Sequence, residues 1–493
     1  MPQVQKITSS EVAKHALAED CWIVVNGKVY DLTKFAPNHP GGAEIIHQFA
    51  GKDGTKTYNM YHSKELIEKE LVDEDKKGDF DESSIDSKWT DANKEDESAK
   101  SPLDPEQKPP LAALINADDF ERSFEKYGPR KPWAYITGAS NDLLTYDANK
   151  TCWHKLWFRP RIMRDVKAIT TRTKMLGQEV TMPLLIAPMG IAKTAGDEGE
   201  LALGAGAARG GIIHVQSTAA SFSVEDILAA VPKTHPYFFQ LYVDRNRKKT
   251  EELLQRLETM DQIKAIFVTV DLPVVSKREA DERVLEEQKV SLYSGDGVTN
   301  KPDKKGGGLA RTTGGFIEWQ LTWNDLPWIK RFTSKPIVIK GIQTAADAKL
   351  ALELGCAGIV VSNHGGRALD NAPATLLSLL EIRRDCPEVF TRMEVYVDGG
   401  VRRGSDILKA VMIGAQGVGV GRPFQCAVAY NTNGVEHLCD IFQDELETAM
   451  RLCGVTDLNK VRGDMQYLNT SELDQFLPPK PQTGLFGFLR SKL

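Results

Sequence analysis

Cysteine motifs and long apolar runs are absent from this 493-residue sequence. Its seven cysteines are scattered and form no CxxC pair, which favours reduced thiols over a disulfide framework and excludes a cysteine-rich zinc or iron–sulfur site. No stretch approaches the roughly 18 apolar residues that a membrane span needs. The net charge of −6 gives no general reason to expect nucleic-acid binding. We therefore expect neither a nucleic acid nor a membrane as a partner.

Composition divides the chain into two folded regions. Residues 1–78 combine short strands and helices, and Asn26-Gly27 between two β-rich runs predicts a hairpin. Residues 79–108 are acidic, rich in Ser and Pro and poor in apolar side chains, so we expect a flexible linker that cannot bury enough surface to become ordered. Residues 109–480 form the larger region, and residues 481–493 form a tail that ends in Ser-Lys-Leu.

The larger region alternates apolar strand-like runs with helix-compatible stretches. This pattern is typical of a parallel sheet covered by helices, and eight such units predict a (β/α)8 TIM barrel of the α/β class, preceded by a small α+β domain. The connection between Arg278 and Lys340 is polar, Gly-rich and too long for a simple barrel loop, so we expect a mobile lid or a disordered insertion there. The eight runs are 183–190, 212–218, 237–243, 265–271, 336–342, 358–364, 394–400 and 417–423.

Two histidines mark a candidate metal site in the N-terminal region. His39 begins the sequence His-Pro-Gly-Gly, and His62 follows 23 residues later. Two imidazoles from separate elements can bind an iron from both faces of a planar macrocycle, while the Pro-Gly-Gly turn lets the backbone approach its edge. The alternative is a pair of unrelated surface histidines. On these motifs residues 7–78 resemble a cytochrome b5-type domain. The resemblance implies non-covalent haem b with His39 and His62 as its axial ligands, and an iron that carries electrons.

The ends of several strand-like runs carry residues suited to proton transfer and charge stabilisation. His364, in Ser-Asn-His-Gly-Gly-Arg, is a natural proton acceptor near neutral pH, and Arg367 offers a planar fork suited to a carboxylate. Asp271 is placed to orient His364 and to stabilise its protonated form. Lys340 supplies positive charge where a reduced flavin becomes anionic. Each residue alone has a structural explanation, but together, at barrel strand ends, they predict an active site.

Two glycine-rich segments close the last two runs. Asp398-Gly399-Gly400-Val401-Arg402 and Gly419-Val420-Gly421-Arg422 combine backbone amides with two arginines at the usual phosphate site of such barrels. A cradle for one phosphate suits FMN. No GxGxxG motif follows an early strand, so the sequence does not support NAD binding on a Rossmann unit.

Residues 109–480 resemble the FMN-dependent L-2-hydroxy-acid oxidase and dehydrogenase family throughout their length, through SNHGGR, VDGGVRRG, VIKG, QLYV and TVDLP. For the substrate, the resemblance implies His364 as the base acting on the hydroxyl or the α-hydrogen, Asp271 as its partner, Arg367 and Tyr135 at the carboxylate, Tyr242 at the hydroxyl or keto oxygen, and Arg278 as a supporting cation. For the cofactor, it implies Ser217, Gln240, Thr269 and Lys340 at the flavin ring, Asp398 at the ribityl chain, and Arg402, Gly421 and Arg422 at the phosphate, with Pro188, Met189, Gly190, Gly399 and Gly400 completing the site.

With both regions joined, the chain resembles the flavocytochrome b2 type of L-lactate:cytochrome c oxidoreductase. The resemblance implies an L-2-hydroxy-acid dehydrogenase that passes electrons from FMN to haem b and then to an acceptor such as cytochrome c, and it implies a homotetramer. The alternative is an oxidase that uses oxygen and produces hydrogen peroxide. The sequence leaves open whether the α-hydrogen leaves as a proton or as a hydride, because both routes need the same residues.

Two positions depart from that family. The first strand-like run ends Pro188-Met189-Gly190, where relatives more often carry Thr and Ala at the last two positions, and Ala219 stands where lactate and glycolate enzymes carry a large apolar residue. Both positions face the substrate's side chain in the family. Gly190 and Ala219 therefore predict a pocket that accepts lactate but prefers a bulkier acid such as mandelate. The alternative is that neighbours such as Met189 refill the space.

The location that the sequence predicts differs from that of the enzymes it resembles. Ser491-Lys492-Leu493 reads as a peroxisomal address at a free C-terminus. Lactate:cytochrome c enzymes work in the mitochondrial intermembrane space, yet the first residues here show neither an apolar signal core nor an Arg-rich presequence. We expect a peroxisomal protein, with the cytoplasm or the intermembrane space as alternatives.

Overall fold

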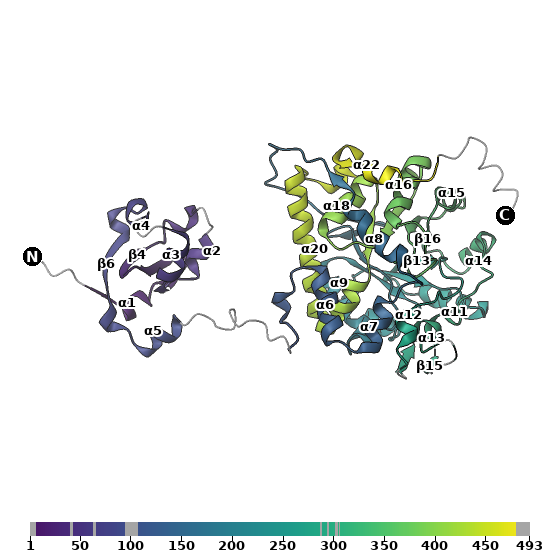
Figure 1. The fold of residues 1–493 in the computed structure, drawn as a ribbon, viewed down its shortest axis with the longest axis horizontal. Helices are drawn as coiled ribbons and strands as arrows, with labels where there is room; N and C mark the ends of the chain where they lie inside the picture. Colours follow the sequence, from purple (N-terminus) through teal and green to yellow (C-terminus); the bar gives the residue numbers. More distant parts are fainter. Residues whose placement is uncertain are drawn as a thin grey trace, which may run out of the picture. The chain divides into compact units, whose positions relative to one another are not determined.

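The computed structural model describes residues 6–39, 43–62, 66–93, 107–285, 288–292, 295–300, 304 and 306–479. The chain forms two compact units, Met1–Asp104 and Pro105–Leu493 (Figure 1). Each unit has its own buried apolar core and is a separate domain.

A small twisted sheet forms the N-terminal unit, with strand order β1-β6-β4-β3-β2 and β5 paired to β3. The predicted hairpin is confirmed, because Asn26 and Gly27 join β3 to β4 with positive φ angles of 51° and 77°. The strands are β1 (Ile7–Thr8), β2 (Ala16–Leu17), β3 (Asp20–Val25), β4 (Lys28–Asp31), β5 (Lys52–Asp53) and β6 (Lys76–Asp81). The helices are α1 (Ser9–Val12), α2 (Ala43–His47), α3 (Thr55–Tyr61), α4 (Leu66–Glu70) and α5 (Ser87–Ala92).

The N-terminal unit continues past the boundary expected at residue 78. Strand β6 pairs with both β1 and β4, and α5 follows it. Phe80 and Trp89 are both 6% exposed and stack with their ring centroids 5.4 Å apart. Residues 79–93 are therefore part of the folded unit and not linker, because two aromatic side chains anchor an otherwise polar segment. The remainder of the expected linker falls mostly on residues 94–106, which lie outside the described residues.

Eight parallel strands close into a barrel in the C-terminal unit, which confirms the predicted fold. Their order around the barrel follows the sequence, and β19 closes onto β10. Each of the eight predicted strand-like runs overlaps a barrel strand. The strands are β10 (Leu184–Ile186), β11 (Ile213–Ser217), β12 (Tyr237–Leu241), β13 (Ile263–Thr269), β16 (Ile337–Ile342), β17 (Gly358–Val361), β18 (Glu394–Asp398) and β19 (Gly417–Val420).

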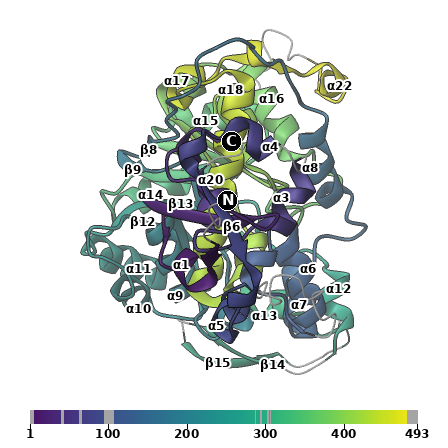
Figure 2. The ribbon, with the colours of Figure 1, turned by 90° about the vertical axis from the view of Figure 1, so that its left-hand side faces the viewer.

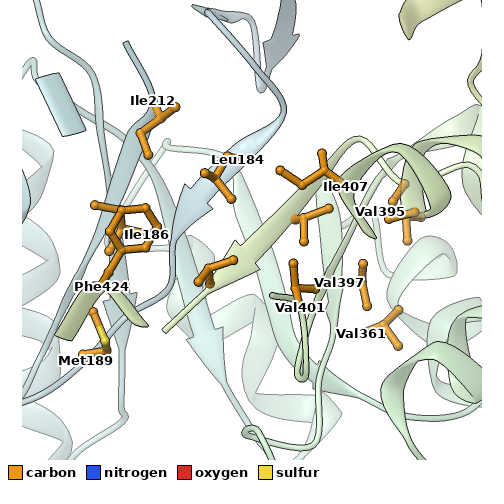
Figure 3. Close-up of a cluster of buried hydrophobic side chains, with 14 of the residues drawn as sticks. Leu184, Ile186, Met189, Ile212, Val361, Val395, Val397, Val401, Ile407 and Phe424 are labelled. Atoms are coloured by element: carbon orange, nitrogen blue, oxygen red, sulfur yellow. The ribbon is translucent and has the colours of Figure 1, made fainter. Parts of the chain in front are cut away.

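Apolar side chains on both faces of the strands build two cores. Inside the barrel, Ile213, Phe238, Phe267 and Tyr396 pack together with other strand residues. Outside it, the alternate residues pack against the helices, and Figure 3 shows Leu184 and Ile186 of β10 among this outer layer with Val361, Val395, Val397, Ile407 and Phe424. Such strands are apolar on both faces, which explains why they were recognisable as continuous apolar runs.

Helices surround the barrel, and side-chain caps define where several of them begin. Asn116, Ser223 and Thr344 each accept a hydrogen bond from the backbone N–H three residues later. The helices are α6 (Ala117–Tyr127), α7 (Arg130–Thr137), α8 (Leu144–His154), α9 (Gly199–Gly210), α10 (Val224–Ala229), α11 (Arg247–Glu258), α12 (Glu279–Arg283), α13 (Leu309–Gly314), α14 (Leu326–Lys330), α15 (Ala345–Glu353), α16 (Thr375–Asp385), α17 (Val389–Arg392), α18 (Gly404–Ile413), α19 (Arg422–Ala427), α20 (Asn431–Cys453), α21 (Leu458–Val461) and α22 (Ser471–Asp474).

One end of the barrel is sealed. The hairpin of β8 (Thr173–Met175) and β9 (Gln178–Val180) precedes the first barrel strand, and Met175 and Val180 pack with the residues that fill the barrel interior. The open end is therefore the C-terminal end of the strands. Strands β7 (Trp157–Phe158) and β20 (Leu468–Asn469) form a further short pair.

The long connection after Arg278 carries its own secondary structure, which differs from a disordered insertion, one of the two alternatives that the sequence left open. It contains α12, the hairpin of β14 (Gln288–Leu292) and β15 (Gly295–Asn300), α13 and α14, and the hairpin lies beside α12 and α13 (Figures 1 and 2). Residues 286–287, 293–294, 301–303 and 305 lie outside the described residues.

A buried ion pair connects the start of this excursion to α7 and to α13. The Nζ atom of Lys131 on α7 lies 3.0 Å from the Asp281 carboxylate and donates to the Val284 carbonyl at 2.9 Å. That carboxylate accepts the backbone N–H groups of Leu309 and Ala310, each at 3.0 Å. Lys131 and Asp281 are 2% and 0% exposed, so this pair joins α7, α12 and α13 away from solvent.

All seven cysteines are buried free thiols, as the absence of a disulfide pattern suggested. Cys21 lies in the N-terminal unit, and the other six lie in the barrel unit. Among the described residues, no helix combines the length and the apolar character that crossing a membrane requires.

Candidate active site

Two adjoining cavities lie at the C-terminal end of the barrel strands. They share Pro188, Met189, His364 and Arg367. Every residue that the sequence assigned to the substrate or the flavin lines one of them, apart from Asp271, which lies behind His364. The first cavity contains Tyr135, Gly190, Ser217, Ala219, Gln240, Tyr242, Thr269 and Arg278, and the second contains Lys340, Asp398, Gly399, Gly400, Arg402, Gly421 and Arg422.

His364 and Asp271 form a hydrogen-bonded pair. The His364 Nδ1 atom lies 2.9 Å from Asp271 Oδ1, and the Asp271 side chain is fully buried. An ionised carboxylate only accepts hydrogen bonds, so Nδ1 carries the hydrogen and Nε2 is left able to accept a proton. Burial lowers the pKa of His364 below its usual 6.5, although Asp271 opposes this effect. The imidazole is therefore a neutral base at neutral pH.

The backbone aims His364 into the cavity. His364, Gly365 and Gly366 have φ angles of 58°, 63° and 81°, three successive left-handed residues that begin three positions after the end of β17. A Cβ on Gly366 would lie 2.8 Å from the Tyr146 backbone, so only glycine fits there. The glycines of Ser-Asn-His-Gly-Gly-Arg thus allow the sharp turn that presents the histidine.

Tyr242 and two arginines surround the accepting side of His364. The Tyr242 hydroxyl lies 3.4 Å from His364 Nε2. Arg367 donates from Nε to the Gly138 carbonyl at 3.1 Å and from Nη2 to the Tyr135 carbonyl at 3.0 Å, which fixes its guanidinium at the cavity wall. Burial, with the charge of Arg367 beside it, lowers the pKa of Arg278 to about 10, so Arg278 still carries its charge at neutral pH.

Lys340 is a fixed cation that lines the second cavity and lies beside Asp271. Its Nζ donates to Ser362 Oγ at 2.9 Å and lies 3.3 Å from Asp398 and 3.8 Å from Asp271. Burial alone would lower the pKa of Lys340, but Asp398 and Asp271 raise it above its ordinary value. The site therefore holds a permanent positive charge next to any anion formed there.

Buried polar atoms at the strand ends suit a ligand with hydrogen-bonding edges. Within the described part of the chain, Gln240 Nε2 and Thr269 Oγ1 are buried and have no hydrogen-bond partner, although both residues line the first cavity. Ser217 Oγ donates to Gln240 Oε1 at 3.1 Å and so orients the amide. Buried unpaired groups are costly, so these atoms are suited to the edge of a flat heterocycle such as a flavin.

The two predicted phosphate arginines line the second cavity but also bind protein groups. Arg422 donates to the Gly365 carbonyl at 2.9 Å, and burial, followed by the charge of Arg367, lowers its pKa to about 9. Arg402 Nη2 lies 2.7 Å from Glu121 of α6. The structure thus brings both arginines to the predicted place, and it adds an acidic partner for Arg402 that the sequence did not suggest.

Sequence reasoning missed the apolar wall of the first cavity. Leu272 and Val275 follow β13, while Ala310, Gly314 and Ile317 come from α13 and the residues after it. For the wall residues that come from α13 and beyond it, the only signal was the length of the connection after Arg278. The excursion therefore contributes directly to the pocket instead of only covering it.

The N-terminal unit contains a separate, larger cavity of about 620 Å³ with mostly apolar walls. His39 and His62 both line it, with their ring centroids 6.1 Å apart and their planes at 78°. This arrangement leaves room for one metal ion between the rings inside an apolar slot, which fits a haem with two imidazole ligands. Pro40, Gly41 and Gly42 of the His-Pro-Gly-Gly motif lie outside the described residues.

Comparison with known proteins decides the family. The sequence pattern of FMN-dependent dehydrogenases matches residues 125–468, and that of the cytochrome b5-like haem/steroid binding domain matches residues 8–81. The chain belongs to the FMN-dependent dehydrogenase family. In this family member the dehydrogenase follows a cytochrome b5-like domain, and its cofactors are FMN and haem b.

Two kinds of relative match different shares of this FMN-dependent dehydrogenase. L-lactate dehydrogenase (cytochrome) of Saccharomyces cerevisiae is 38% identical over 94% of this chain and 80% of its own length. Glycolate oxidase of Spinacia oleracea is 37% identical but matches only 71% of this chain. Among solved structures, a flavocytochrome b2 double mutant with pyruvate bound has a TM-score of 0.67 at 37% identity, covering 77% of this chain and 93% of its own. A mandelate oxidase with (S)-4-hydroxymandelic acid has a TM-score of 0.66 at 32% identity, covering 72% and 98%.

Proposed function

We propose that this dehydrogenase oxidises an L-2-hydroxy acid to the 2-keto acid on FMN and passes the electrons through haem b to an external acceptor such as cytochrome c. The observation that carries the proposal is the His364–Asp271 pair, whose free nitrogen faces Tyr242 in a cavity that also holds two arginines. The L-lactate dehydrogenase (cytochrome) relatives, which match both domains, support it.

Each group around the cavity has a role in this reaction. Arg367, with Tyr135, binds the substrate carboxylate, and Arg278 adds a second positive charge. Tyr242 binds the hydroxyl oxygen that becomes the keto oxygen. His364 Nε2 takes the proton, and Asp271 stabilises the resulting imidazolium through Nδ1.

The oxidation releases two electrons and two protons; His364 takes one proton, and the reduced flavin, when FMN is bound, or solvent would take the other. FMN, when bound, accepts the electron pair, and haem carries electrons one at a time toward the acceptor. Lys340 lies where it stabilises negative charge next to the flavin ring. Gln240, Thr269 and Ser217 bind the edge of the ring, and the glycine-rich turns with Arg402 and Arg422 bind the phosphate. His39 and His62 bind the haem iron.

The substrate pocket is proposed to accept a bulkier acid than lactate. Gly190 and Ala219 both line the first cavity. Met189 lines the same cavity, so the substrate comparison below decides between an enlarged pocket and one that Met189 refills. Solved flavocytochrome b2 variants include one with a leucine-to-alanine substitution and benzoylformate bound, and one with alanine-to-glycine and leucine-to-alanine substitutions. The glycine and the alanine that these substitutions introduce are the residue types that this chain carries at Gly190 and Ala219.

One experiment tests the reaction and the pocket together. Holoenzyme is mixed anaerobically with L-lactate or L-mandelate while the flavin and haem spectra are followed. We expect flavin bleaching followed by haem reduction with both acids, and a larger kcat/KM for mandelate. Ala219→Leu should lower the mandelate-to-lactate ratio about tenfold, because one large side chain in a hydrophobic pocket is worth roughly 1–3 kcal/mol. A ratio far in favour of lactate that Ala219→Leu leaves unchanged would contradict the pocket, and no bleaching with either acid would contradict the reaction.

An oxidase that reduces oxygen to hydrogen peroxide is the second candidate. The glycolate oxidase and mandelate oxidase relatives support it for the barrel, but they match only that part of the chain. The cytochrome b5-like domain favours the dehydrogenase. Peroxide formed per keto acid separates the two, and a ratio near one in the presence of cytochrome c would favour the oxidase.

Assembly and location remain proposals. A homotetramer is proposed by family analogy, and mass measurement in solution tests it. Residues 480–493 lie outside the described residues, and the peroxisomal address at Ser491-Lys492-Leu493 competes with the intermembrane space, which suits a cytochrome c reductase. A reporter carrying the last residues of the chain should enter peroxisomes if the address works, and cytosolic spread would count against it.

A further inference from the structure

Glu200 is a buried carboxyl group that none of the roles above uses. It lies in the first turn of α9 and is 0% exposed. Its Oε1 atom accepts two backbone hydrogen bonds, from Ala192 at 2.8 Å and from Ser221 at 3.0 Å. Burial raises the pKa of Glu200 above its ordinary value. A buried acid with two strong contacts and no solvent access requires a structural or functional reason.

The two amides belong to the two loops that form the specificity wall. Ala192 follows Gly190 by two residues in the loop after β10, and Ser221 follows Ala219 by two residues in the loop after β11. Gly190 and Ala219 line the substrate cavity. A single oxygen of Glu200 therefore joins the two loops without lining the cavity itself.

The conformation that Glu200 holds is strained and tightly packed. Ile191 is fully buried and has a φ angle of 48°, a left-handed conformation that costs a β-branched residue roughly 1–3 kcal/mol. Its N–H donates to the Ala219 carbonyl at 2.9 Å. A Cβ on Gly190 would lie 3.1 Å from both the Cβ and the carbonyl oxygen of Ala219. Such close contact between the loops persists only if their surroundings hold it.

We propose that Glu200 is a positioning residue that sets substrate selectivity by fixing Gly190 against Ala219. This inference rests on the proposed 2-hydroxy-acid dehydrogenase function. Glu200 does not touch the substrate or the flavin. It acts through the Ala192 and Ser221 amides, which determine how far apart the two walls of the pocket stand.

The chain offers a matched control on the same helix end. Glu198 Oε2 accepts hydrogen bonds from the backbone N–H of Thr432 at 3.0 Å and from its hydroxyl at 2.9 Å. It thus connects the start of α9 to α20, not to the pocket loops. Glu198→Ala loses a comparable set of hydrogen bonds without touching the specificity wall.

The first test compares selectivity in holoenzyme. Glu200→Ala should lower the mandelate-to-lactate ratio of kcat/KM at least fivefold, mainly through KM for mandelate. Glu200→Gln should stay within twofold of the natural protein, because its amide oxygen can accept both N–H bonds. Glu198→Ala should also leave the ratio within twofold. A ratio that Glu200→Ala leaves unchanged, or that Glu198→Ala shifts equally, overturns the inference. If Glu200→Ala does not fold, Glu200→Asp serves in its place, because its carboxylate ends one carbon short of the two amides.

The second test does not depend on substrate. Amide hydrogen exchange is measured in full-length holoenzyme on peptides covering residues 187–194 and 217–223. Glu200→Ala should speed exchange at Ala192 and Ser221 at least tenfold, whereas Glu198→Ala should not. Unchanged exchange overturns the inference even if the enzyme oxidises both acids. Faster exchange in a protein whose flavin neither acid reduces would instead place the failure in the proposed function.

Discussion

His364 lies between charges with opposite effects on its basicity. Burial and the neighbouring Lys340 lower its pKa, while Asp271 raises it. On the other side of the pair, burial would raise the pKa of Asp271, but His364 and Lys340 bring it below its ordinary value. The pair is therefore neutral imidazole with carboxylate at neutral pH, ready to accept one proton.

Substitution of Asp271 tests this balance. Removing the anion in Asp271→Asn should lower the pKa of His364 further, so the rise of kcat/KM with increasing pH should move to lower pH. The plateau rate of flavin reduction should fall about 10²–10⁴-fold, because the imidazolium loses its stabilising partner. Anaerobic stopped-flow measurements across the pH range provide both values. A shift of the inflection to higher pH would contradict the assigned roles.

At the scale of single residues, the sequence predicted site residues that stand in local motifs but not those whose role depends on long-range contacts. His364, Arg367 and Lys340 were recognisable because each stands at the end of an apolar strand-like run. The pairing of Arg402 with Glu121 was not, since that acid lies on a helix that precedes the whole barrel. Glu200 had no motif at all, and only its burial and its two amide partners single it out.

Among the elements, the excursion after Arg278 depends on the buried Lys131–Asp281 pair. Lys131→Met should leave the Asp281 charge uncompensated and lower the free energy of unfolding of the barrel by about 3–5 kcal/mol. Proteolysis within the excursion should also accelerate, because α12 and α13 lose their common anchor. Urea unfolding and limited proteolysis measure these effects. Lys277→Met is the control, since Lys277 is 63% exposed and its ion pair with Glu279 is long at 3.9 Å. It should change stability by less than about 0.5 kcal/mol.

The segment after residue 78 provides a second test at this scale. Trp89→Ala should destabilise the haem domain by about 3–5 kcal/mol, because it removes a buried ring that packs on Phe80. Thermal unfolding followed at the haem band measures the loss, and Lys88→Ala on the same helix is the exposed control. If the midpoint of thermal unfolding of the haem domain did not change, residues 79–93 would have to be regarded as linker. Composition alone assigned this segment to the linker, because its average is mostly polar, although the burial of two aromatic side chains is enough to keep it folded.

For the whole molecule, two cofactor sites on separate domains predict separable functions. His62→Ala should lose haem but retain FMN, so flavin reduction by the hydroxy acid should stay within about twofold. Reduction of cytochrome c should fall at least a hundredfold, because the electrons lose their path out of the flavin. Absorbance at the haem and flavin bands with both acceptor assays checks this outcome. Retained cytochrome c reduction in a haem-free protein would contradict the relay.

The overall architecture was largely predictable, because a barrel of this kind repeats one simple pattern eight times. Parallel strands buried on both faces are continuous apolar runs, and each of the eight predicted runs overlaps a barrel strand. The excursion was not predictable in the same way. Its hairpin and short helices are stabilised by contacts with α7 and with each other. The sequence has no periodic pattern of apolar residues there that would predict these elements.

The distribution of the buried cysteines allows local unfolding of each domain to be followed separately. One cysteine, Cys21, lies in the haem domain and six lie in the barrel, all of them buried. Burial also raises the pKa of Cys21 to about 11, so the folded thiol is unreactive. Treatment with a thiol-labelling reagent followed by intact-mass analysis gives the number of modified cysteines per molecule, and this number tells which domain has exposed its interior. A single added label would record the first domain alone, and six would record the second.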